Sequence, residues 1–271
     1  MTDLTVRRLL VDLDAPIARH WCGGDPFRTA LFNALSMSFP VGEQLFIDAV
    51  KKSLASLPEE RRQAMAAEVQ GFVGQEATHR RIHERFNAQL AQQGLKNHWE
   101  QRILARRGRL LEPIDDARPW AGVTAATEHW TAIFAQHLLG QPWLLEGTEP
   151  RLAALWQWHS AEELEHRSTA FDLYRALGGN ELWRRRLFRI VSFNFVVDTL
   201  RQTANNLWHD GTLFKPATWA SAWKTLFGRR GFVRRGFKPW RAYLRADFHP
   251  LQGDGSGGER WLASNASLVP P

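Results

Sequence analysis

Residues 158–166 read Trp-His-Ser-Ala-Glu-Glu-Leu-Glu-His, and this stretch indicates how the chain folds. His159, Glu163 and His166 are separated by steps of four and three residues, so they share one face of an α-helix. Apolar residues continue the same spacing through residues 152–177, which predicts one amphipathic helix over that range. Three consecutive positions of its apolar stripe are polar, as expected for a buried binding site.

A second helix is predicted over residues 59–93, starting after a proline and ending before a glycine. Its inward stripe is also polar at the centre, where Glu76, His79 and His83 follow one another in steps of three and four residues. The Glu-x-x-His spacing of Glu76 and His79 repeats that of the first helix. Each pair therefore presents a carboxylate and an imidazole to one point.

Each of two further predicted helices carries a single glutamate in its apolar stripe, Glu43 in one and Glu128 in the other. Glu43 lies 33 residues before Glu76, and Glu128 lies 35 residues before Glu163. This spacing indicates two similar helix pairs. We therefore expect an all-α fold, a ferritin-like antiparallel four-helix bundle with additional C-terminal helices.

The chain divides into four predicted parts. A basic, irregular connection is expected over residues 96–118 within the bundle, and a fifth amphipathic helix is expected over about 181–208, followed by a shorter one after Pro216. The parts are an N-terminal segment (1–20), the metal-binding bundle (21–180), a basic helical extension (181–250) and a flexible Gly/Ser-rich tail (251–271).

The positive charge is concentrated late in the chain. The net charge is +7, yet residues 184–245 carry 14 Lys or Arg against Asp198 and Asp210, which leaves −5 for the remaining residues. For this basic segment we favour a solvated helix face whose apolar side docks on the bundle. Contact with a membrane or another anionic surface is the less favoured alternative, and nucleic acid is less favoured still.

Cysteine content limits the chemistry, because the single Cys22 excludes an internal disulfide and a thiolate metal cluster. Metal ligands must then be histidines and carboxylates, and a reducing, cytoplasmic setting is expected. Residues 1–13 alternate charged and apolar side chains, unlike a secretory signal, and no run of 18 apolar residues predicts a transmembrane helix. A homodimer is compatible with these features.

The polar positions together predict a dinuclear metal site. Four ionised carboxylates in a bundle core would repel one another, whereas two divalent cations would neutralise them. A buried hydrogen-bonded network without metal is the alternative. In the metal interpretation Glu43 and Glu128 are terminal ligands, Glu76 and Glu163 bridge the two ions, and His79 and His166 each give one nitrogen.

Oxygen-rich ligation with few nitrogens favours two iron ions, with manganese or a mixed Mn/Fe pair as alternatives and zinc less natural. We favour His159 as a third imidazole ligand over a role as an outer hydrogen-bond donor. For His83 and Glu162 we favour the outer role. Glu165 and His129 lie off the stripes and are expected to be outer partners or exposed ion-pair formers.

Several of these segments resemble a bacterial family labelled predicted metal-dependent hydrolases, from about residue 21 to residue 179, with a weaker similarity near residue 248. The resemblance implies a metal-dependent enzyme. The matching segments are Phe-Pro-Val-Gly-Glu (39–43), Gly-Gln-Glu-Ala-Thr-His (74–79), Glu-His (128–129), Trp-His-Ser-Ala-Glu-Glu-Leu-Glu-His (158–166), Ala-Phe-Asp (170–172) and Phe-His-Pro (248–250).

A narrower similarity concerns His159-x-x-x-Glu163-x-x-His166, which resembles the ligand helix of the di-iron arylamine N-oxygenases. The rest of the chain does not follow that family, so its substrate class does not carry over. The similarity implies seven ligands: Glu43, Glu76, His79, Glu128, His159, Glu163 and His166.

Three functions fit these features. We favour an oxygen-activating oxidoreductase that uses dioxygen and a small organic substrate, because carboxylate-bridged metals in helical bundles suit redox chemistry. The main alternative is a metal-dependent hydrolase that uses a metal-activated water. A non-enzymatic iron-handling protein is a further alternative.

Overall fold

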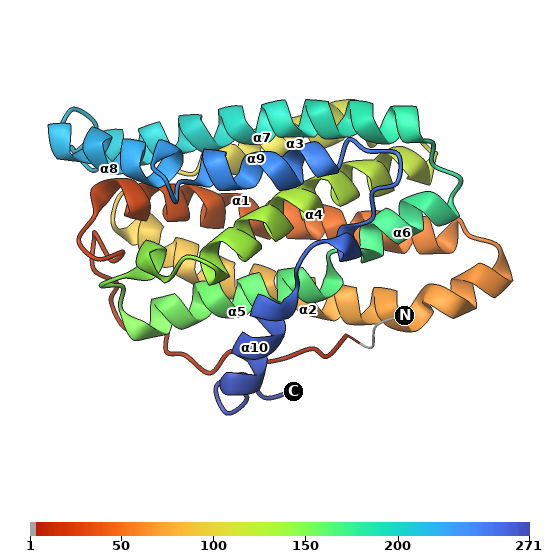
Figure 1. Ribbon diagram of the computed structural model, residues 1–271, viewed down its shortest axis with the longest axis horizontal. Coiled ribbons are helices and arrows are strands. Elements are labelled where there is room, and N and C mark those ends of the chain that lie inside the picture. Colours follow the sequence, from red (N-terminus) through yellow and green to blue (C-terminus); the bar gives the residue numbers. More distant parts are fainter. Residues whose placement is uncertain (1–3) are drawn as a thin grey trace.

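The computed structural model describes residues 4–271, and over this range it consists of helices without a β-strand (Figure 1). A single isolated bridge pairs Cys22 with Thr148. The predicted all-α class is therefore confirmed. No helix in the described range is long and apolar enough to cross a membrane.

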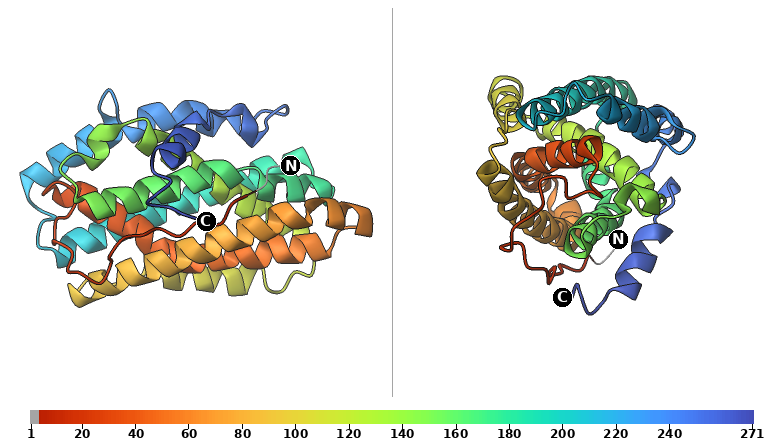
Figure 2. Two further views of the ribbon diagram at one scale, coloured as in Figure 1. Left: turned by 90° about the horizontal axis from the view of Figure 1, so that it is seen from below. Right: turned by 90° about the vertical axis from the view of Figure 1, so that its left-hand side faces the viewer.

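Four helices lie side by side and enclose the centre of the molecule (Figures 1 and 2). The first two form one antiparallel pair and the last two form the other, with the short helix η1 (Pro142–Leu145) in the second connection. The four are α1 (Pro26–Ala55), α2 (Glu59–Gln92), α4 (Ala117–Leu139) and α5 (Pro150–His166).

Local sequence accounts for where these helices begin. Asp25 caps α1 by accepting a hydrogen bond from the backbone N–H of Arg28 at 3.1 Å, and Pro26 occupies the first helical position. Asp116 caps α4 through the N–H of Arg118 at 2.8 Å. α1 then continues as one helix through Pro40.

Two predictions about helix boundaries are wrong. The connection expected to be irregular contains α3 (Trp99–Leu110), whose first turn is capped because Asn97 Oδ1 accepts hydrogen bonds from two backbone N–H groups. The helix expected over 152–177 divides at residues 167–168 into α5 and α6 (Thr169–Ala176). The spacing of apolar residues cannot predict such a break, because the apolar stripe continues across it.

Three helices of the basic extension form a layer over one side of the four central helices (Figures 1 and 2). The longest, α7 (Glu181–His209), packs on both α1 and α4 and lies where the sequence predicts it. The shorter helix after Pro216 is α8 (Pro216–Phe227), and α9 (Phe232–Ala242) was not foreseen. We call α7, α8 and α9 the outer layer.

The C-terminal residues are not the flexible tail that their Gly/Ser content suggested. They contain η2 (Pro250–Gln252) and α10 (Ser256–Ser264), which packs on α5. The backbone N–H of Arg8 donates to Pro270 O at 2.8 Å, so the two terminal segments run together. Leu262 and Val269 become buried, and this apolar contact outweighs the local Gly/Ser composition.

The apolar core has two large clusters on either side of the predicted polar positions. One contains Phe32, Phe86 and Trp156, and the other contains Phe46 and Phe72. Along α1 and α2 the site glutamates fall between residues of the two clusters. The polar centre is therefore closed above and below by packed apolar side chains.

A substitution at Gly71 tests how closely the N-terminal segment packs against α2. A Cβ atom at this position would lie 2.6 Å from Leu4 Cβ and 2.8 Å from Leu4 O. Gly71→Ala should therefore lower the free energy of unfolding by about 1 to 3 kcal/mol through overpacking, measured by urea denaturation.

The matched control is Gly108→Ala in α3, where the nearest atom to the new methyl group is Glu112 Oε2 at 3.6 Å. This variant should be more stable by about 0.5 to 1 kcal/mol, because alanine favours helix. Equal changes in the two variants would contradict the packing described here.

Candidate metal centre

The seven residues predicted as metal ligands converge on one buried place between α1, α2, α4 and α5. Every one of their side chains is buried, and no residue among them exposes more than 3% of its surface. They are grouped so that one donor atom of each lies within 4.8 Å of the others in its group. The groups are Glu43 with His79 and His159, Glu76 with His79 and Glu163, and Glu76 with Glu128 and His166.

His166 is the centre of the first half of the site. Its Nε2 atom lies 3.2 Å from Glu76 Oε1, 3.3 Å from Glu128 Oε2 and 3.6 Å from Glu163 Oε2. One imidazole nitrogen thus faces carboxylates from three different helices. Three oxygens and one nitrogen around a common point are a donor set suited to iron or manganese.

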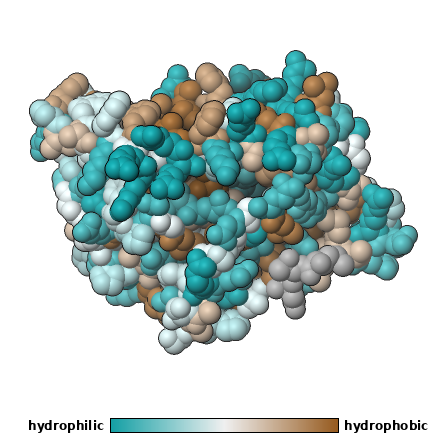
Figure 3. Space-filling model, in the orientation of Figure 1, coloured by the Kyte–Doolittle hydropathy of each residue, from teal (hydrophilic) through white to brown (hydrophobic). Residues whose placement is uncertain are grey.

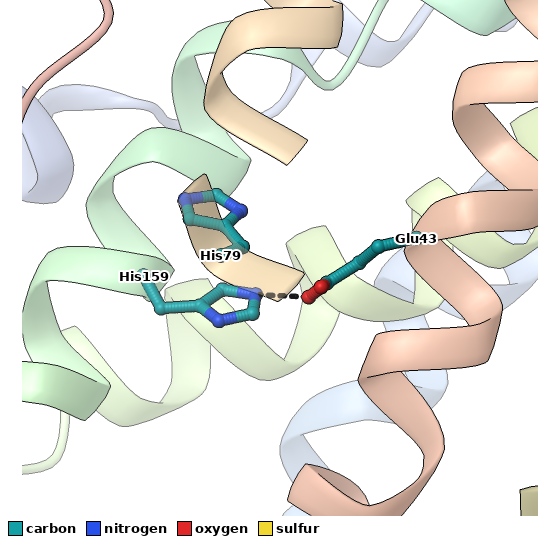
Figure 4. A group of neighbouring side chains, drawn as sticks. All are labelled: Glu43, His79 and His159. Atoms are coloured by element: carbon teal, nitrogen blue, oxygen red, sulfur yellow. Dashed lines mark ion pairs between the residues drawn. The ribbon is translucent and has the colours of Figure 1, made fainter. Parts of the chain in front are cut away.

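The second half of the site is formed by two stacked imidazoles and Glu43. The rings of His79 and His159 are nearly parallel, with centroids 4.2 Å apart. Figure 4 shows Glu43 of α1 pointing toward His159 of α5, whose Nε2 lies 4.0 Å from Glu43 Oε1. His79 Nδ1 lies 3.8 Å from Glu163 Oε1.

Glu163 faces both halves of the site. Its Oε1 atom lies 2.9 Å from His159 Nε2, while its Oε2 atom lies on the side of His166. Glu76 likewise belongs to a group with His79 and to a group with His166. These two residues therefore lie between the two halves of the site, and their role as bridging ligands stays a prediction.

Unpaired buried atoms indicate what the site can hold. Within residues 4–271, no hydrogen-bond partner is found for either carboxylate oxygen of Glu43, Glu76 and Glu128. The same is true of Glu163 Oε2, His79 Nδ1 and His166 Nε2. Leaving so many buried polar atoms unpaired is costly. Two divalent cations would satisfy them, so the donor set fits a dinuclear centre.

The pKa values reflect burial first and the crowding of like charges second. Burial, followed by the neighbouring glutamates, raises the pKa of Glu43 well above its usual range, and burial raises the pKa of Glu128 to about 7. Burial also opposes ionisation of Glu163, yet the nearby His166 and His159 lower its pKa. Burial lowers the pKa of His79, which favours the neutral imidazole that a metal requires.

Each predicted ligand histidine has a hydrogen-bond partner on its outer nitrogen. His79 Nε2 lies 3.0 Å from Glu162 Oε2, and Arg7 Nη1 donates to Glu162 Oε1 at 3.2 Å. Burial raises the pKa of Glu162 to about 8, although Arg7 opposes this rise. A cation at His79 Nδ1 would place the proton on Nε2 and favour the carboxylate form of Glu162.

Gln75 is the hydrogen-bond partner of the outer nitrogen of His166. Its amide nitrogen donates to Thr5 O and to Glu165 Oε2, both at 2.9 Å, so its oxygen is the acceptor for His166 Nδ1 at 2.9 Å. This places the proton of a neutral His166 on its outer nitrogen. Arg7 in turn donates to Glu165 at 2.7 Å. Sequence reasoning missed Gln75 and Arg7, whose contacts depend on the folded N-terminal segment.

His159 is oriented by a hydrogen-bonded chain. The amide of Asn87 donates to Ser36 O, so its oxygen accepts from the Ser36 hydroxyl at 2.7 Å. Ser36 Oγ then accepts from His83 Nδ1, and His83 Nε2 accepts from His159 Nδ1, both at 2.8 Å. His159 Nε2 lies 2.9 Å from Glu163 Oε1, and a cation bound between them would replace the proton of this hydrogen bond and accept the nitrogen lone pair, which supports the proposed role of His159 as a ligand.

Off-stripe His129 lies apart from this network. It packs against Phe188, Tyr243 and Phe248, and its Nε2 donates to Pro239 O at 3.0 Å. Burial lowers its pKa to about 4. His129 thus attaches the C-terminal segments to α4 and lies outside the metal centre.

A cavity of about 630 Å³ adjoins the site at Glu43. It lies among α1, α3, α4 and α7, and Phe39, Phe46, Ile103 and Val191 are among its mostly apolar lining residues. A smaller space of about 20 Å³ is bordered by His159 and Glu163 and shares Phe39, Thr131 and Phe195 with the cavity. An apolar molecule could therefore lie beside the predicted metal ligands.

Comparison with protein families agrees with this site. A family model described as "predicted metal-dependent hydrolase" matches residues 5–254. This chain belongs to that family. The match covers the seven candidate ligands and the outer layer, and it confirms the resemblance read from the sequence. No curated protein and no solved structure matches the chain.

For this member of the predicted metal-dependent hydrolases, purified protein loaded with manganese or ferrous ion should bind two ions per chain. Glu163→Gln should reduce this number to one or none, because Glu163 faces both halves of the site. Elemental analysis after gel filtration measures the ratio. Glu84→Gln, an exposed change on the same helix as His79, should keep two ions; equal metal loss in both variants would contradict the assignment.

The outer partner of His166 gives an independent test. Gln75→Leu should weaken metal binding by about 10- to 100-fold, because His166 loses the acceptor that fixes its tautomer and orientation. Competition with a coloured chelator measures the affinity. Gln63→Leu, an exposed change on α2, is the control. Unaltered affinity in Gln75→Leu would show that this hydrogen bond does not orient the ligand.

Proposed function

We propose that the protein is a metal-dependent hydrolase with a dinuclear centre that acts on an apolar organic substrate. The observation that carries this proposal is the convergence of seven buried donor residues directly beside an apolar cavity. The family description supports hydrolysis as the reaction class. The proposed ligands are Glu43, Glu76, His79, Glu128, His159, Glu163 and His166.

Two divalent cations held there would lower the pKa of a bound water and so supply a nucleophile near neutral pH. Glu76 and Glu163 would hold the pair together from α2 and α5, while Glu43 and Glu128 would complete one end each. In the metal-loaded form the outer partners would hold the outward protons of the three imidazoles and leave each inner nitrogen lone pair for an ion. The outer partners thus fix the ligand geometry before substrate binds.

The cavity determines which part of a substrate can reach the centre. Glu43 is the ligand residue at its wall, so a susceptible bond placed there would lie beside the metals. The hydroxyls of Thr127 and Thr131 are already bonded to carbonyls of their own helix, and Asp198 is paired with Arg102 and Arg106. The remaining lining is mostly apolar and would bind hydrocarbon.

A second candidate is an oxygen-activating oxidoreductase with two iron ions, or a manganese-containing pair. The observation in its favour is the ratio of four carboxylates to three imidazoles, which suits iron or manganese better than zinc. Ferrous ions bound there would supply electrons to dioxygen. The same cavity would hold the organic substrate. An iron-handling protein would have no use for an apolar space of this size.

Metal exchange separates these reactions. The zinc- and manganese-loaded forms should hydrolyse chromogenic esters with medium-length acyl chains in the absence of oxygen, because hydrolysis requires no change of oxidation state. Absorbance of the released chromophore measures the rate, and Glu163→Gln serves as the inactive control. Dioxygen uptake by the ferrous form without ester turnover by any form would favour the oxidoreductase and contradict hydrolysis.

A further inference from the structure

The outer layer has an unusual surface. All eight strongly exposed Trp and Phe side chains within residues 4–271 belong to residues 183–237. Figure 3 shows hydrophobic side chains along the upper edge of the molecule, where α7 and α9 run. Exposed aromatic groups gathered on one layer indicate a surface that binds something.

Helix α8 shows the pattern most clearly. Trp219, Trp223 and Phe227 follow one another at intervals of four residues and expose 57%, 68% and 45% of their surfaces. They form an outward aromatic stripe. Ala222 and Thr225 on the opposite face are buried, and α8 packs on α1 and α9. The aromatic stripe of α8 therefore packs on no other helix.

Helix α7 carries a second outward stripe, whose members lie 11 and 7 residues apart, or about three and two helical turns. Leu182, Phe193 and Leu200 expose 76%, 70% and 54% of their surfaces. The exposed Arg186 and Arg189 occupy intervening positions of this stripe. Aliphatic, aromatic and guanidinium groups thus alternate along the outer side of one long helix.

The positive charge of the layer has little neutralisation from its own acidic residues. Glu181, at the start of α7, pairs with the buried Arg184. Asp198 pairs with Arg102 and Arg106 of α3, and Asp210 pairs with Arg19 and His20. The basic residues of α8, α9 and the turn between them, residues 224–241, are all exposed. An anionic partner would complement this charge.

We propose that the outer layer binds the surface of an anionic lipid bilayer. Helices with aromatic and aliphatic groups on one side and Lys or Arg beside them lie in the plane of a membrane interface. The arginines would contact lipid phosphates while the Trp and Phe side chains enter the headgroup region.

Two other occupants fit the surface less well. A symmetric dimer through this layer would place the layer against itself and bring its arginines together. Nucleic acid would use the arginines and aromatic rings. It would leave Leu182, Val196 and Leu200 exposed to water. Lipid accounts for the aliphatic, aromatic and basic groups at once.

The cavity lies at the edge of the same layer. Trp183 and Ile190 of α7 and Leu110 of α3 line it, and each exposes about half of its surface. An apolar substrate dissolved in the bilayer would enter between α3 and α7 without crossing water. This step rests on the proposed function, whereas membrane binding by the layer does not.

Co-sedimentation of the full chain with vesicles tests the proposal. The protein should bind vesicles that contain phosphatidylglycerol and phosphatidylcholine in equal amounts. Binding to pure phosphatidylcholine should be weaker, and binding to the mixed vesicles should weaken as salt is raised. No binding to the mixed vesicles at low salt would overturn the proposal.

Variants locate the contact. Arg186→Gln with Arg189→Gln should weaken partitioning by about fivefold for each arginine, and Trp219→Ser with Trp223→Ser should weaken it by about tenfold or more. Matched controls elsewhere on the surface are Arg81→Gln and Leu10→Ser, which should bind as the parent protein does. Thermal denaturation should show that all four proteins are folded.

Two other results would contradict membrane binding by the outer layer. A dimer in light scattering that the Trp219 and Trp223 changes dissociate, without vesicle binding, would assign the layer to a second copy. Tighter binding to a single-stranded oligonucleotide than to vesicles would assign it to nucleic acid. Because metal content and hydrolysis of a soluble ester should be unchanged in these variants, failure of the membrane proposal is distinguishable from failure of the proposed hydrolase.

Discussion

The structure depends on the burial of four carboxylates within a few ångströms of one another. Glu43, Glu76, Glu128 and Glu163 come from four helices and expose almost no surface. Charges so close in a medium of low dielectric constant repel strongly unless cations or protons neutralise them. Burial, together with the neighbouring carboxylates, raises the pKa values of the first three. A pair of divalent ions is the partner that four ionised carboxylates can best accommodate.

The surroundings of the centre serve mainly to orient its imidazoles. His79, His166 and His159 each contact a different outer group, and two of these contacts lead back to Arg7. The N-terminal segment is thereby coupled to the metal ligands, and the small residue at Gly71 lets that segment approach α2. On the other side, α3 and α7 leave the apolar cavity that reaches Glu43. Closure on one side and access on the other suit an enzyme whose substrate enters from a single direction.

The sequence predicted the all-α class and the convergence of the seven candidate ligands, because both depend on helical periodicity. Polar residues that replace apolar ones at steps of three and four residues lie on the buried face of a helix. This placement does not depend on where the helix begins or ends. Periodicity could not reveal Arg7 or Gln75, because the contact of Arg7 with Glu165 joins residues 158 positions apart. The order of residues 251–271 was missed for the same reason: Leu262 and Val269 gain their burial only from distant segments. Exposed aromatics on α7 and α8 also resemble core residues until the packing is known.

Anomalous diffraction from crystals grown with manganese or iron tests the dinuclear centre most directly. Two peaks are expected, about 3.5 to 4 Å apart as in other two-metal sites. One should lie among Glu76, Glu128, Glu163 and His166, and the other among Glu43, His79, His159 and Glu163. Fully loaded crystals with no anomalous peak between α1, α2, α4 and α5 would show that the buried carboxylates form a metal-free polar network, and would contradict the central claim.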